Sequence, residues 1–164
     1  MKITMVVVLY KQKPEESKTF LTLKQTLFAK NEGLKDIELI LYDNSPEKQA
    51  FSPLDYEGLH ITYIHDSRNL GIATAYNHAW TKAKANGSQW LLLLDHDTEL
   101  TDTYINQVVT LREFAKEVAA IVPKINSENQ MISPVYSHSL RPLTEEGQRQ
   151  GYRSSRSWPL IPAP

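Results

Sequence analysis

The sequence contains no cysteine and carries almost no net charge, and each absence excludes a class of protein. Without cysteine among its 164 residues, the chain can form neither a disulfide framework nor a zinc or iron–sulfur site with cysteine ligands. Its formal net charge of −1 provides no overall field that would attract nucleic acid, so an anionic ligand must be held by a local site. Because a cysteine-free chain fits a reducing compartment, we expect a cytoplasmic protein. From the net charge, we expect no nucleic-acid partner.

Long hydrophobic runs are absent as well. The apolar opening, residues 3–10, is much shorter than the roughly 18 to 20 residues that cross a bilayer. It also lacks the small-residue cleavage site of a signal peptide, so it predicts a buried strand. Any contact with a membrane would therefore be peripheral, at its inner face.

Glycine is scarce where common nucleotide-binding folds require it. Residues 11–14, which follow the first apolar run, read Lys-Gln-Lys-Pro and contain no glycine, which disfavours a nicotinamide-binding Rossmann enzyme. The Gly-Lys-Ser/Thr signature of a phosphate-binding loop is also absent from the chain.

What the chain does contain is a series of short apolar runs rich in Val, Ile and Leu, which predict strands. They cover residues 3–10, 37–42, 61–64, 90–94 and 118–122. Near-continuous runs of this kind favour a sheet that is covered on both faces. With 41% apolar and 23% charged residues, the composition is that of a globular protein about one domain in size.

Helical periodicity lies between several of these runs. The first helix is predicted to open at Pro14 and to stop near Gly33. The second is predicted over residues 72–85, with Gly87 just past its end, and the third begins near residues 101–102. The alternation predicts an α/β fold with a mostly parallel sheet flanked by helices, whose ligands bind beyond the carboxyl ends of the strands.

The pattern changes after about residue 125. Residues 126–164 are rich in Ser, Pro, Arg and Gln and lack a clear apolar period. We therefore divide the chain into a folded part over residues 1–125 and a segment over 126–164, which is either a polar tail or the start of an interrupted second half.

Two carboxylates follow the fourth predicted strand directly. Asp95 and Asp97 flank His96 at the end of a run of four leucines. Hard oxygen donors at such a position suit Mg²⁺ or Mn²⁺, and a divalent ion there would neutralise charge on a departing diphosphate. An isolated Asp-x-Asp is also common as a solvated turn, and the sequence leaves the role of His96 open.

Two other predicted strand ends carry suggestive polar residues. Asp43 ends the second strand and could accept a hydrogen bond from a nucleotide, or it could form an Asx turn within Asp-Asn-Ser-Pro. Asn69 and Gly71 precede the second helix, where small residues would let a ligand approach the helix amino end. The small residues serve equally well for packing the helix on the sheet.

Taken in order and spacing, these segments resemble the nucleotide-binding half of family 2 glycosyltransferases of the GT-A fold. The resemblance covers roughly residues 1–125 and rests on four pieces of sequence. They are Val8-Leu9-Tyr10, Asp43-Asn44-Ser45, Asn69-Leu70-Gly71-Ile72-Ala73 with Asn77, and Leu92-Leu93-Leu94-Asp95-His96-Asp97. The resemblance implies a GT-A-type, Rossmann-like fold that binds a nucleoside-diphosphate sugar with Mn²⁺ or Mg²⁺.

The resemblance also assigns roles to individual positions. Leu9 and Tyr10 match the strand end that lies against the base, and Asp43 matches the acid that contacts it. Asn69, Gly71 and Asn77 fall in the segment that lines the nucleotide pocket. Asp95 matches the acid near the ribose and sugar, and Asp97 matches the metal ligand.

The same resemblance implies transfer of a sugar from a dTDP or UDP donor to a glycan or lipid-linked acceptor. The Asp-Asn-Ser and Leu-Leu-Asp-x-Asp pieces resemble rhamnosyltransferases of bacterial surface polysaccharide synthesis, and an inverting outcome comes with the family. The acceptor-binding half normally supplies a carboxylate base. Glu145-Glu146 is the adjacent acidic pair downstream, but it lies in polar sequence, so the catalytic base is left unassigned.

Two other functions remain open. A truncated, non-catalytic nucleotide-sugar-binding module would keep the fold and the donor site without turnover. A haloacid-dehalogenase-type phosphatase also places Asp-x-Asp after an apolar strand, but it uses an early strand and a Thr or Val where this chain has Glu99.

Overall fold

The computed structural model describes residues 2–30, 34–109, 120–123, 125–127 and 130–133. The chain divides into two compact units, residues 1–113 and 114–164, and each is described by itself. The first unit holds four strands, which are β1 (Ile3–Leu9), β2 (Ile37–Asp43), β3 (His60–His65) and β4 (Trp90–Asp95). Its α-helices are α1 (Lys18–Thr26), α2 (Ile72–Asn86) and α3 (Asp102–Val109), and its 3-10 turns are η1 (Pro14–Glu16), η2 (Phe28–Lys30), η3 (Leu34–Asp36) and η4 (Pro53–Asp55).

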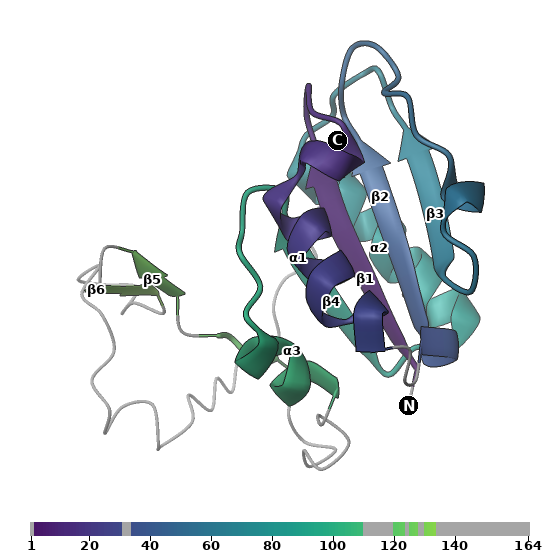
Figure 1. The fold of residues 1–164 in the computed structure, drawn as a ribbon. Coiled ribbons are helices and arrows are strands. Elements are labelled where there is room, and N and C mark those ends of the chain that lie inside the picture. Colours follow the sequence, from purple (N-terminus) through teal and green to yellow (C-terminus); the bar gives the residue numbers. More distant parts are fainter. Residues whose placement is uncertain (1, 31–33, 110–119, 124, 128–129, 134–164) are drawn as a thin grey trace, which may run out of the picture. The chain divides into compact units, whose positions relative to one another are not determined.

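The four strands form one parallel sheet in the order β3-β2-β1-β4 (Figure 1). Each strand is one of the predicted apolar runs, and β1 is buried along its whole length because both of its faces are covered. The expected α/β fold with a parallel sheet is therefore confirmed. The chain adds β2 and β3 on one side of β1 and then crosses to the other side for β4. The carboxyl ends of β1 and β4 consequently flank a topological switch point.

Two hydrophobic clusters cover the two faces of this sheet. One joins α1 and α3 to β1 and β2 through side chains that include Phe20, Leu23 and Ile105. The other joins α2 to the opposite face, where Ala75 and Ala79 pack against Val6, Val8, Ile40 and Tyr42. Alanine lets α2 lie close to the sheet, so the packing role that the sequence left open for the small residues of this helix is realised.

The first helix begins later than predicted. Pro14–Glu16 forms the separate turn η1, and α1 begins at Lys18 with Ser17 as its N-cap. The Ser17 hydroxyl accepts a hydrogen bond from the backbone N–H of Phe20 at 3.3 Å, which satisfies one of the unpaired amides of the first turn. The capping serine therefore decides the start of the helix. Gly33, the predicted stop, lies outside the described residues.

The predicted strand over residues 118–122 is wrong for the part that the structure describes. Residues 120–122 form no strand, and Ile121 and Val122 are 43% and 61% exposed. A short apolar run forms a strand only where a neighbour completes its hydrogen bonds, and within the described residues none pairs with this one. Instead, the second unit contains an antiparallel pair, β5 (Ile125–Ser127) and β6 (Gln130–Ser133), which the sequence pattern did not predict.

The second helix ends as its sequence predicts. Gly87 adopts a left-handed conformation with φ of 75°, and the N–H of Ser88 donates to the carbonyl of Ala83 at 2.9 Å. None of the described helices combines the length and the apolar character that crossing a bilayer requires.

We expect Gly87→Ala to lower the free energy of unfolding by about 1 kcal/mol. A Cβ at this position would meet no atom within 4 Å, so the cost arises from the backbone conformation alone. Urea denaturation measures the loss. Gly87→Asn should recover part of it, because asparagine tolerates the left-handed region. Equal stability of the alanine variant and the parent would contradict this account of the helix end.

Candidate functional site

The carboxyl ends of β1, β2 and β4 bring three of the predicted site residues to one edge of the sheet. In the strand registers, Leu9 is opposite Asp43, and Val8 is opposite Asp95. Neighbouring parallel strands lie about 4.8 Å apart, so the Asp43 and Asp95 backbones are separated by two strand spacings, roughly 10 Å. A ligand extending along this edge could therefore meet both segments.

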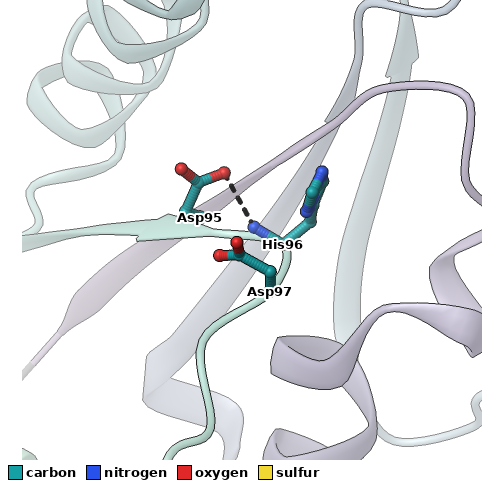
Figure 2. Close-up of side chains that lie close together, drawn as sticks. All are labelled: Asp95, His96 and Asp97. Atoms are coloured by element: carbon teal, nitrogen blue, oxygen red, sulfur yellow. Dashed lines mark hydrogen bonds between the residues drawn. The ribbon is translucent and has the colours of Figure 1, made fainter. Parts of the chain in front are cut away.

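The Asp95-His96-Asp97 segment forms a compact group at the end of β4 (Figure 2). One ligand atom from each of the three side chains lies within 4.8 Å of the others. Asp95 and Asp97 are exposed and His96 is partly buried, and Asp95 Oδ1 accepts a hydrogen bond from the His96 backbone N–H at 2.9 Å. Figure 2 shows the two carboxylates near each other, with the imidazole to one side of them. Two accessible carboxylates with this spacing fit a hard divalent cation.

The loop that carries these acids is held by the amino end of α1. The Ser17 hydroxyl donates to the His96 carbonyl at 2.8 Å, and the Thr19 backbone N–H donates to the same oxygen at 3.2 Å. The Thr19 hydroxyl contacts the carbonyls of Asp95 and Thr98, the latter at 2.9 Å, and accepts from the Thr98 N–H at 3.1 Å. Thr19 is fully buried. Ser17, the N-cap of α1, and Thr19 therefore fix the backbone that carries Asp95 and Asp97.

Asp43 is fully buried, and its carboxylate is engaged by its own chain. Oδ1 accepts from the Ser45 N–H at 2.9 Å, which is the Asx turn that the sequence allowed. Oδ2 accepts from the Tyr63 hydroxyl and from the Gln49 N–H, the latter at 3.3 Å. Burial and the hydrogen bond to Asp43 both raise the pKa of Tyr63, so its hydroxyl remains a proton donor. Asp43 thus organises the loop after β2.

The loop between β3 and α2 lies beside Asp43. The Asp66 N–H donates to the Asp43 carbonyl at 2.8 Å, and the Asp66 carboxylate accepts two hydrogen bonds from the Arg68 guanidinium, both at 2.8 Å. The hydrogen bonds from Arg68 hold the pKa of the Asp66 carboxyl well below its usual range. Asn69 and Gly71 follow, and both have a positive φ, of 47° and 85°. The Asp66–Arg68 ion pair and these two backbone conformations shape the loop that leads into the amino end of α2.

The remaining predicted residues differ in accessibility. Leu9 is fully buried in the core, whereas Tyr10 is 41% exposed at the end of β1, with the Lys11 ammonium 5.2 Å from its ring centre. Asn69 and Asn77 are exposed. The structure thus brings Leu9, Asp43 and Asp95 to one edge, and it gives Leu9 and Asp43 buried positions. Residues 145–146 lie outside the described residues.

Sequence reasoning missed Ser17, Thr19, Tyr63 and the Asp66–Arg68 pair. Ser17, Thr19 and Tyr63 act through hydrogen bonds to segments 14 to 79 residues away, so no local motif marks them. A serine and a threonine at the start of an otherwise amphipathic helix are the nearest signal.

Comparison with known proteins gives one relative and one family. The relative is an uncharacterized protein from Haemophilus influenzae, which is 35% identical over 80 residues, covering 45% of this chain and 42% of that protein. The chain therefore spans less than half the length of this relative, and no solved structure matches it. The family described as "Glycosyl transferase family 2" matches residues 6–158, which extends past residue 125. Its members act on nucleotide-sugar donors, and the parallel sheet with flanking helices agrees with their GT-A-type fold. Because the match covers most of the chain, the protein belongs to glycosyltransferase family 2.

Proposed function

We propose that this chain binds a nucleoside-diphosphate sugar, with dTDP or UDP as the nucleotide, and that it is a glycosyltransferase that transfers the sugar in surface polysaccharide synthesis. The observation that carries the proposal is the pair of exposed carboxylates, Asp95 and Asp97, at the switch point of a family 2 sheet. Ligands of parallel α/β sheets bind at such a point. A divalent ion held by the acid pair would neutralise the negative charge of a diphosphate.

We assign the predicted site residues to different parts of the donor. Asp97 would hold a Mn²⁺ or Mg²⁺ ion, which supplies charge neutralisation for the departing nucleoside diphosphate. Asp95 lies beside it, near the ribose and the sugar. Tyr10, Asn69, Gly71 and Asn77 line the nucleoside end, while Leu9 and Asp43 support that pocket from buried positions. A dTDP donor, a rhamnosyltransferase-like specificity and an inverting outcome are part of this proposal, as is a lipid-linked or glycan acceptor at the inner face of the membrane.

Titration calorimetry with UDP and dTDP, each with Mn²⁺ and with a chelator, tests donor binding. We expect both nucleotides to bind in the presence of Mn²⁺ and to bind much more weakly without it, because the diphosphate must otherwise approach two bare carboxylates. A tighter complex with dTDP would support the rhamnosyltransferase-like donor. Absence of measurable heat for every nucleotide, with or without metal, would refute the proposal.

A non-catalytic binding module is the second candidate, because the sequence leaves the catalytic base open. Assays of sugar hydrolysis and of sugar transfer with a dTDP- or UDP-sugar distinguish the binding module from the enzyme. Nucleotide binding with no turnover would favour the binding module, and robust turnover by the 164-residue chain would favour the complete enzyme.

A further inference from the structure

His96 is the residue of the candidate metal site whose role the sequence leaves open. Its side chain is partly buried, while the carboxylates of Asp95 and Asp97 on either side of it are exposed. One imidazole nitrogen lies within 4.8 Å of a ligand atom of each carboxylate, and Figure 2 shows the ring beside them. The ring therefore lies where it can take part in the chemistry of this group.

The Nδ1 atom of His96 is buried and has no hydrogen-bond partner, a property that it shares among the described residues with Asn44 Oδ1 alone. Burying a polar atom without a partner costs free energy, and native proteins seldom keep one without a use for it. The two atoms differ in their surroundings. The His96 ring belongs to a group whose two acids are exposed, so an ion can reach this group from solvent.

The backbone of His96 holds the ring in place. Its carbonyl accepts hydrogen bonds from the Ser17 hydroxyl at 2.8 Å and from the Thr19 N–H at 3.2 Å. Its N–H donates to Asp95 Oδ1 at 2.9 Å. Both backbone polar groups thus have partners within the chain, which leaves the imidazole as the part of His96 that meets a ligand.

We propose that the imidazole of His96 is a third ligand of the divalent ion, and that it makes the site prefer Mn²⁺ to Mg²⁺; the inference rests on the proposed function. An unprotonated imidazole nitrogen is a common metal ligand, so an ion held by the carboxylates would give Nδ1 the partner that it lacks. Ligand atoms on opposite sides of an ion, each roughly 2.1 Å from it, lie about 4.2 Å apart. Small side-chain rotations therefore suffice to bring all three ligand atoms to one ion.

A nitrogen ligand changes which cations the site favours. Mg²⁺ takes oxygen ligands and keeps several of its waters, whereas imidazole is a ligand of first-row transition metals. The affinity of a given site for these metals rises from Mn²⁺ to Co²⁺. The difference in affinity between Co²⁺ and Mg²⁺ therefore measures what His96 adds to the two carboxylates.

Calorimetry on the full chain with UDP, in the presence of Co²⁺ or of Mg²⁺, tests this assignment through His96→Phe. Phenylalanine keeps a planar ring but has no nitrogen. With Co²⁺ we expect UDP to bind the variant at least about tenfold more weakly than the parent, and with Mg²⁺ within about twofold of it. His96→Asn, whose side chain is smaller and polar, keeps the test available if the phenylalanine ring does not fit. Its preference for Co²⁺ over Mg²⁺ should fall as well, because an amide oxygen replaces the nitrogen.

His60→Phe is the matched control. His60 is exposed at the first position of β3, at the opposite end of the strands from the candidate site, so its loss should leave UDP affinity unchanged with both metals. An equal loss with Co²⁺ and Mg²⁺ in His96→Phe would place the imidazole on the phosphate and would overturn the assignment. Co²⁺-dependent affinity close to that of the parent would overturn it too. A parent chain that binds UDP with neither metal would overturn the proposed function together with this inference, and so the two failures are distinguishable.

Discussion

Asp97→Asn is expected to weaken UDP binding in the presence of Mn²⁺ by more than about 100-fold, and to raise the weak metal-free affinity slightly, because one of the two carboxylates that repel the diphosphate is neutralised. Loss of a residue that merely supports a metal ligand typically costs 10- to 100-fold in metal affinity, so loss of a charged ligand should cost at least as much. Asparagine keeps the size of the side chain and an oxygen, but it removes the charge that attracts the cation. Because Asp97 is exposed, the substitution should not destabilise the fold.

Glu99→Gln is the control for this experiment. Glu99 lies in the same loop and pairs with Lys18 at 3.2 Å, but it does not belong to the compact group of Asp95, His96 and Asp97. Neutralising it changes the net charge of the loop by the same amount. We expect its Mn²⁺-dependent affinity to stay close to that of the parent, as measured by calorimetry across a range of Mn²⁺ concentrations. Equal losses in both variants would mean that general charge, and not coordination by Asp97, governs binding.

The four strands of the sheet could be predicted because each contains a short apolar run, although β3 and β4 are only partly buried. β1 and β2 show the pattern most clearly, since nearly every residue in them is buried. The boundaries of α1 were harder to predict. Pro14 and the acids after it favour a helix start as strongly as Ser17 does, and only the hydrogen bond from Phe20 to Ser17 settles the choice. Residues 118–122 failed because apolar character does not specify a pairing partner.

The positions of the candidate acids could also be predicted from the strand ends, because parallel strands in one sheet end at a common edge. Their environments could not. Nothing in Asp43-Asn44-Ser45 indicates that Asp43 receives the Tyr63 hydroxyl from a strand 20 residues away. In the same way, the sequence around Asp95 gives no sign of the contact from Thr19, 76 residues earlier. Long-range hydrogen bonds of this kind depend on the tertiary fold, and they distinguish an acid that supports the site from one that is open to a ligand.

Thr19→Val is expected to lower the free energy of unfolding by about 2 kcal/mol and to weaken Mn²⁺-dependent UDP binding by about tenfold. Valine has nearly the same shape as threonine, so the packing of this fully buried side chain is kept. What is lost is the hydroxyl that reaches the Asp95 carbonyl and both backbone groups of Thr98. The loop that carries Asp97 would lose these hydrogen bonds to α1, although its His96 carbonyl would still accept from the Ser17 hydroxyl and the Thr19 N–H. Urea denaturation and calorimetry measure the two effects.

Thr81→Val provides the matched control, because the Thr81 hydroxyl bonds only to the Asn77 carbonyl, one turn earlier on the exposed side of α2. Its stability and its UDP affinity should remain near those of the parent, apart from the small effect of valine on helix propensity. Thr19→Ser separates the two expected effects further, since serine restores the hydroxyl but lacks the methyl group. If the hydroxyl positions the metal site, the serine variant regains UDP affinity even where it does not regain stability. If Thr19→Val loses stability and keeps full UDP affinity, the Thr19 hydroxyl supports the fold without positioning Asp97.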